Sequence, residues 1–123
     1  QSLDSSQLTR TFMQERLQHH TNEVFACAFL DTHLRLIAFE ELFFGTVNQA
    51  NIYPREIVKR TLELNAAKVI LAHNHPSGDA TPSQADKDVT ETIIRALELI
   101  EVQVIDHLVV GRKVYSFAEM GEI

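Results

Sequence analysis

Cysteine is nearly absent from this sequence of 123 residues, in which Cys27 stands alone. A single thiol excludes an intrachain disulfide framework and a zinc site built from several thiolates. The apolar neighbours of Cys27, from Phe25 to Phe29, indicate a small buried residue. We therefore expect the protein to occupy a reducing compartment.

Long apolar runs are missing as well. No segment approaches the roughly 18 apolar residues that are required to cross a bilayer. Residues 1–16 are polar and lack the apolar centre of a signal peptide. These absences predict a cytoplasmic protein without a membrane partner.

Positive charge is also in short supply. Lys and Arg total 11 against 17 Asp and Glu, which gives a formal net charge of −6 with neutral His. The basic residues form no run, and an acidic chain repels the phosphate backbone of DNA. Sequence-neutral DNA binding is therefore disfavoured.

The four glycines and three prolines fall at boundaries rather than in one linker, and no repeat or low-complexity tract is present. Apolar residues make up 45% and charged residues 23% of the chain, close to the average of soluble globular proteins. A chain of this length suits one domain with one core. We expect a single domain over residues 1–123.

Hydrophobic periodicity and turn residues predict an α/β order of elements. The expected elements are a helix over 5–18 in an N-terminal extension of about 1–21, a buried strand over 24–30, strands over 34–39 and 42–47 interrupted at Gly45, a helix from Pro54 to Asn65, a strand over 69–72, a helix with Thr81 as N-cap and Pro82 at its first position, a strand over 102–110 and a short strand over 114–117. A tight turn at Asp31 favours an antiparallel pair, and the strand-helix-strand order across 42–72 allows a parallel one. The prediction is a mixed sheet flanked by helices.

Two histidines stand where the strand over 69–72 runs into a polar loop. His73 and His75 are two residues apart, so in an extended chain their side chains point the same way from Cα atoms roughly 6.5 to 7 Å apart. Asp86 follows His75 by eleven residues and can add a carboxylate oxygen. Two His and one carboxylate are a zinc ligand set that leaves the fourth tetrahedral position to a water with a pKa lowered to about 7. This pattern predicts hydrolysis, which also requires a carboxylate to carry a proton.

The spacing is more specific than the histidine pair alone. From His73 to Asp86 the sequence fits H-x-H-x7-S-x2-D, with Ser83 as the serine, and so resembles the JAMM (MPN+) zinc metalloprotease signature. The segment LFFGTVNQANIYPREIVKRTLELNAAKVILAHNHPSGDATPSQAD and the later DHLVVG are similar to the bacterial RadC-type branch of that family. The similarity extends over residues 22–112.

The resemblance implies one Zn²⁺ per chain, held by His73, His75 and Asp86, in a JAMM/MPN-like three-layer α/β sandwich of the cytidine-deaminase-like type. It also implies that Ser83 hydrogen-bonds the tetrahedral oxyanion or the metal-bound water. The RadC name derives from a proposed part in DNA repair, and longer members of the branch carry an N-terminal helix-hairpin-helix region. Asn74 stands where many JAMM enzymes carry Ser or Thr.

The resemblance further implies a catalytic glutamate from an early strand, which no local motif identifies. Glu23, at the head of the first buried strand, is preferred over Glu40 and Glu41, because a carboxylate at the mouth of a core strand can reach a cleft. Glu40 and Glu41 look more like a solvated strand end.

Simpler interpretations compete for the same residues. Ser83 and Asp86 also fit a capping box, in which the serine caps a helix and the acid three residues later reaches back. If Thr81 is the N-cap instead, Asp86 lies past the first turn and is free for a metal. His107 is interpreted as a buried histidine paired with Asp106, and His19, His20 and His33 are expected to be solvated.

Three functions remain open. The first is a zinc-dependent peptidase or isopeptidase with a peptide or isopeptide substrate. The second is a DNA-repair-associated metal-binding factor, against which the net charge argues. The third is a non-catalytic interaction module. A His/His/Asp site also accepts other divalent metals than zinc.

Overall fold

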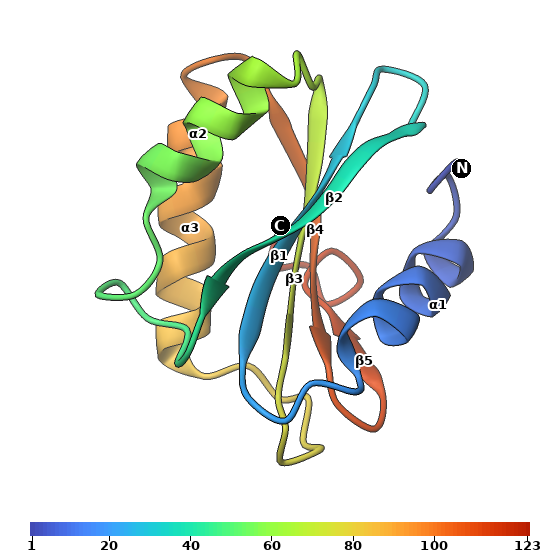
Figure 1. Ribbon diagram of the computed structural model, residues 1–123, viewed down its shortest axis with the longest axis vertical. Coiled ribbons are helices and arrows are strands. Elements are labelled where there is room, and N and C mark those ends of the chain that lie inside the picture. Colours follow the sequence, from blue (N-terminus) through green and yellow to red (C-terminus); the bar gives the residue numbers. More distant parts are fainter.

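The computed structural model describes residues 1–123 as a five-stranded mixed sheet with helices on both faces (Figure 1). The elements are α1 (Ser6–Leu17), β1 (Val24–Leu30), β2 (Leu36–Phe44), α2 (Pro54–Glu63), β3 (Lys68–Asn74), α3 (Gln84–Glu98), β4 (Gln103–Val110) and β5 (Val114–Ser116). Helices α2 and α3 cover one face and α1 covers the other (Figure 1). The α/β sandwich that the sequence predicts is confirmed.

The strand order is β2-β1-β3-β4-β5, and only the β3/β4 pair is parallel. The antiparallel β1/β2 hairpin turns at Asp31 as expected, where the Asp31 carboxylate accepts hydrogen bonds from the backbone N–H groups of His33 and Arg35. The strand-helix-strand unit that joins neighbouring parallel strands is β3-α3-β4. The segment 42–72 does not make such a pair, because β1 lies between β2 and β3.

The central strand β1 is buried along its whole length and faces both cores. Phe25, Cys27 and Phe29 pack toward α2 and α3, while the alternate residues pack toward α1. This two-sided burial explains why the segment is almost wholly apolar instead of alternating. Burial also raises the pKa of the Cys27 thiol, which agrees with a packing role.

Helix α1 buries Thr9, Met13 and Leu17 on one stripe, four residues apart, and leaves Leu8 48% exposed. Helix α2 begins at Pro54, and Asn65 beyond its end adopts a positive φ of 52°, as suits a helix terminator. None of the three helices has both the length and the apolar character that a membrane crossing requires.

Strand β2 joins the two strands that the sequence predicts over 34–39 and 42–47 into one, from Leu36 to Phe44. Its pairing with β1 shifts register between Glu41 and Phe43, and Gly45 follows the strand with a φ of +116°. The Gly45 N–H donates to the Glu23 carbonyl at 2.9 Å. Glu40 and Glu41 therefore lie inside the strand, and the expectation of a solvated strand end is wrong.

Candidate metal centre

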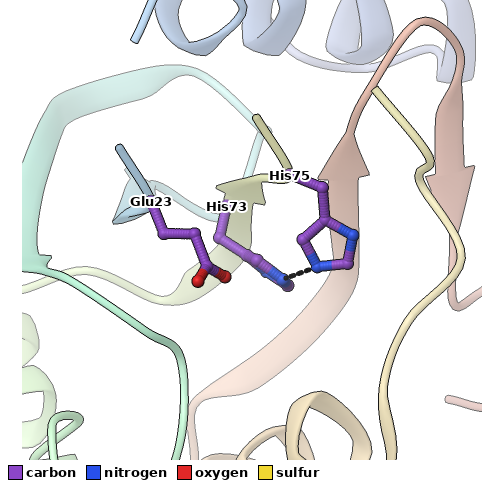
Figure 2. A group of neighbouring side chains, drawn as sticks. All are labelled: Glu23, His73 and His75. Carbon is purple, nitrogen blue, oxygen red and sulfur yellow. Dashed lines mark hydrogen bonds between the residues drawn. The ribbon is translucent and has the colours of Figure 1, made fainter. Parts of the chain in front are cut away.

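Strand β3 carries its regular pairing two residues further than expected, through His73 and Asn74. His73 lies opposite Phe25 of β1 and Val109 of β4, and the N–H of His75 donates to the Val110 carbonyl at 2.8 Å. Backbone pairing on both sides thus fixes His73, and the bond to Val110 fixes His75. Their Nε2 atoms lie 3.1 Å apart, and both rings project into the same space (Figure 2).

Asp86 reaches this pair from the first turn of α3. One carboxylate oxygen lies 3.1 Å from His75 Nε2 and the other 3.3 Å from His73 Nε2. Zinc bonds of 2.0 to 2.2 Å in a tetrahedron place neighbouring ligand atoms about 3.3 to 3.6 Å apart. The Nε2 atoms and the Asp86 oxygens already lie at nearly these separations, and a set of two imidazoles and one carboxylate suits Zn²⁺, so the residues fit the ion.

Asp86 takes part in a capping box and also lies beside the two histidines. Ser83 is the N-cap of α3: its Oγ accepts from the Asp86 N–H at 3.0 Å, and its own N–H donates to Asp86 Oδ2 at 2.8 Å. The expectation of Thr81 as N-cap and Pro82 at the first helical position is wrong, because α3 begins at Gln84. Thr81 instead lies in the preceding turn, where its N–H donates to the Asp79 carboxylate at 3.0 Å. A carboxylate has about four acceptor positions, so Asp86 can both cap the helix and face the histidines.

The Ser83 side chain is exposed at the helix start. Its oxygen accepts the Asp86 N–H, and its hydroxyl proton is not used in that bond. The serine therefore retains one hydrogen-bond donor beside the three candidate ligands.

Glu23 completes the cluster from the head of β1 (Figure 2). It is partly buried, and one carboxylate oxygen and the ligand nitrogens of His73 and His75 lie within 4.8 Å of one another. Of the three glutamates considered, it alone joins this group. Glu40 instead binds Arg60 through two bonds of 2.7 Å, and Glu41 lies 2.6 Å from His20.

That last contact corrects the expectation that His20 is solvated, since the ring is only 25% exposed. Glu41 reaches the His20 ring because β2 continues through residue 41 as far as Phe44. His19 and His33 are exposed as expected.

Asn74, between the two histidines, holds the chain on either side of Glu23. Its side-chain oxygen accepts from the Val24 N–H at 2.7 Å, and its amide nitrogen donates to the Asn22 carbonyl at 3.0 Å. The Gly45 N–H binds the Glu23 carbonyl itself. This role of Asn74 was missed at the level of sequence, which placed the residue in the polar loop after the strand over 69–72.

Opposing effects set the charges at the site. Burial raises the pKa of Asp86, but the His73 and His75 imidazoles outweigh it and hold that pKa far below its ordinary value. The Asp86 carboxylate in turn raises the pKa of His75, against a smaller opposing effect of burial. The His75 Nδ1 faces the Asp79 carbonyl at 2.9 Å, which can only accept, so this nitrogen carries a proton and Nε2 is directed to the cluster.

The loop after His75 is braced by the turn after β4. The Arg112 N–H donates to the Gly78 carbonyl at 2.8 Å. Gly111 lies so close that a Cβ there would meet the same carbonyl oxygen at 2.4 Å. The position of the Asp79 carbonyl therefore depends on a glycine at position 111.

His107 is buried as expected, but its ring is not paired with Asp106. Side chains alternate along a strand, so the two residues face opposite sides of the sheet. The Asp106 carboxylate binds the backbone N–H groups of His107 and Ala118 and the Ser116 hydroxyl. The His107 ring instead lies 2.7 Å from His73 Nδ1, and burial lowers its pKa well below the ordinary value, which keeps the ring neutral.

Sequence similarity to known proteins extends over almost the whole chain. The model of the RadC-like JAB domain family matches residues 3–122. A UPF0758 protein of Methylibium petroleiphilum is 58% identical over 96% of this chain, and those of Cellvibrio japonicus and Ralstonia nicotianae are 55% and 52% identical over 97% and 100% of it. The matches cover 54% or 55% of these relatives, so the chain spans about half the length of the curated relatives it matches.

Proposed function

The chain belongs to the RadC-like JAB domain family, as its motif predicts, and from that premise we propose that it is a zinc-dependent hydrolase of peptide or isopeptide bonds. One observation carries the proposal. The Nε2 atoms of His73 and His75 lie 3.1 Å apart, each lies 3.1 to 3.3 Å from a different Asp86 carboxylate oxygen, and a second carboxylate from Glu23 lies beside them.

A zinc ion held by His73, His75 and Asp86 supplies a Lewis acid that polarises a carbonyl and acidifies water. The second carboxylate then has a separate task. Glu23 accepts a proton at a carboxylate oxygen and passes it to the departing amine, as amide hydrolysis requires. Its backbone is held by Asn74 and Gly45, which keeps the carboxylate beside the histidines.

Ser83 acts on the carbonyl oxygen of the substrate. Its hydroxyl retains a donor while its oxygen is fixed by the Asp86 N–H, so the proton can be directed to the negative charge that develops on that oxygen. Helix α3 thereby contributes both a ligand and an oxyanion donor from residues three apart.

The charge of the chain favours an amide substrate over DNA. With a net charge of −6, the chain has no long-range attraction for a phosphate backbone. A DNA-processing role at the same site requires salt-dependent DNA binding by this chain, which we expect to be absent.

The experiment compares Glu23→Gln with Glu41→Gln in the zinc-loaded chain. A panel of fluorogenic peptides and isopeptide-linked peptides is the substrate set. We expect Glu23→Gln to keep its zinc and to lose activity by about 10²- to 10⁴-fold, the usual contribution of a general acid-base group. Glu41 binds His20 outside the cluster, so Glu41→Gln is expected to match the wild type.

Two results contradict the proposal. Wild-type activity in Glu23→Gln excludes this carboxylate from the chemistry. A stoichiometric zinc complex that cleaves no member of the panel favours the non-catalytic interaction module.

A further inference from the structure

A row of buried polar groups runs from the back of His73 to the backbone of α3. His73 Nδ1 lies 2.7 Å from His107 Nε2, and His107 Nδ1 lies 2.5 Å from the Thr90 hydroxyl. That hydroxyl lies 2.7 Å from the Asp86 carbonyl oxygen. None of the four residues is more than 2% exposed, so each polar atom depends on its protein partners.

The Asp86 carbonyl at the end of this row fixes the direction of every hydrogen bond in it. A carbonyl only accepts, so the Thr90 hydroxyl donates its one proton to Asp86 and must accept from His107 Nδ1. A neutral imidazole has one donor and one acceptor, so His107 Nε2 carries the lone pair. His73 Nδ1 is then the donor, and His73 Nε2 carries the lone pair.

Hydrogen bonds that all run in the opposite direction are incompatible with the short contact between the Thr90 hydroxyl and the Asp86 carbonyl oxygen. That direction requires Thr90 to donate to His107, which leaves the Thr90 and Asp86 oxygens 2.7 Å apart with no proton between them. It also places a proton on His73 Nε2, on the side that faces His75 and Asp86. Only the first direction leaves that nitrogen free to bind an ion.

Aromatic side chains hold the two rings in this arrangement. Phe25 stacks on His73 with an interplanar angle of 15°, and Phe117 stacks on His107 with an angle of 14° and a centroid separation of 4.8 Å. Neither ring can turn over without displacing a buried phenylalanine. The hydrogen-bond partners of each nitrogen are therefore fixed.

We propose that Thr90 and His107 are positioning residues that hold His73 as its Nδ1–H tautomer and direct the Nε2 lone pair into the metal centre. The Asp79 carbonyl does the same for His75 by direct contact. For His73, the Asp86 carbonyl acts through the side chains of Thr90 and His107. The inference rests on the proposed metal site and is independent of the proposed hydrolysis.

The test compares Thr90→Val, which removes the hydroxyl at nearly constant shape, with Thr90→Ser, which keeps it. Imidazole ¹⁵N NMR of the metal-free protein at alkaline pH reports which nitrogen of His73 carries the proton. A chelator competition with Zn²⁺ measures the affinity. Thermal unfolding of the metal-free variants checks that each is folded.

We expect His73 to be protonated at Nδ1 in wild type and Thr90→Ser, and to become a mixture of tautomers in Thr90→Val. Zinc affinity is expected to fall about 10- to 100-fold in Thr90→Val, the usual effect of removing a partner that orients a ligand. Thr90→Ser is expected to stay close to wild type. A merely structural role of Thr90 changes stability but not the tautomer.

The wild-type spectrum alone can overturn the inference, even if Thr90→Val does not fold. A His73 protonated at Nε2 in wild type contradicts it, as does a folded Thr90→Val that keeps the Nδ1–H tautomer and full zinc affinity. Because the NMR measurement requires no metal, it identifies the tautomer equally well if the proposed hydrolase proves inactive or binds no zinc.

Discussion

The side-chain oxygen of Asn74 accepts a hydrogen bond of 2.7 Å from the backbone N–H of Val24. This contact joins the end of β3 to the head of β1, two strand ends that carry the histidine pair and Glu23. The asparagine between the two histidines thus sets the distance between the candidate metal ligands and the second carboxylate.

Replacement of Asn74 tests this link. Asn74→Ala leaves the Val24 N–H and the Asn22 carbonyl without their partner, so we expect the free energy of unfolding to fall by about 1 to 3 kcal/mol. Zinc stoichiometry is expected to persist, because the three candidate ligands are untouched. Urea unfolding and zinc analysis measure the two effects.

An exposed asparagine provides the control. The Asn51 amide donates to the Thr46 carbonyl in a loop, so Asn51→Ala is expected to change stability by much less. Equal losses in the two variants are inconsistent with a special role of Asn74.

Ser83 is expected to act on both stability and metal binding. Ser83→Ala removes the cap of α3 and should cost about 0.5 to 2 kcal/mol of unfolding free energy. Loss of the cap also frees the first turn, so the zinc affinity should fall. Ser83→Thr keeps a capping oxygen and a hydroxyl proton and should retain most of both properties. If Ser83→Ala binds zinc as tightly as Ser83→Thr, the cap does not hold Asp86 in place.

Gly111 is expected to tolerate no side chain. Gly111→Ala places a Cβ 2.4 Å from the Gly78 carbonyl oxygen, so the loop that carries Asp79 must move. We expect lower stability and weaker zinc binding, because the Asp79 carbonyl then no longer orients His75. Gly121→Ala meets no atom within 4 Å and should leave zinc binding unchanged. Calorimetric zinc titration of both variants separates the two cases.

The Glu40–Arg60 pair predicts a stability change with pH. Two hydrogen bonds from Arg60 lower the pKa of Glu40 below its ordinary value of 4.5, against a smaller effect of burial. A lowered pKa in the folded state stabilises the fold above that ordinary value, and the contribution disappears as the pH falls through the folded pKa.

Glu40→Gln should therefore lower the free energy of unfolding at neutral pH by at most about 1 kcal/mol, since Arg60 is partly exposed. The difference from wild type should shrink in acid, which urea unfolding at several pH values can follow. Glu63→Gln removes a longer, exposed contact with Arg60 and should have little effect at any pH. A difference that grows in acid has the wrong sign for this pair.

Local patterns in the sequence were sufficient for much of the fold. Strand β1 was predictable because a run of seven apolar residues, followed by a turn at Asp31, suits a strand buried on both faces. His73, His75 and Asp86 were predictable as a group because their spacing is part of a motif. The structure brings these three side chains together.

Relationships between distant segments were not accessible in the same way. Asn74 meets Val24 across 50 positions and His107 meets Thr90 across 17, and only the order of strands and helices brings them together. The start of α3 was missed for a more local reason. Thr81 and Ser83 are both good caps, and in the structure Thr81 lies in the Asp79 turn while Ser83 caps the helix that begins at Gln84.

The metal content of the purified chain tests the central claim most directly. Elemental analysis after incubation with zinc and removal of the excess compares wild type with His73→Ala, Asp86→Asn and His33→Ala, the last an exposed histidine away from the site. We predict one zinc ion per chain in wild type and His33→Ala and almost none in the other two, with all four proteins folded. Zinc that persists in both ligand variants, or a wild type that binds none, contradicts the assignment of this site.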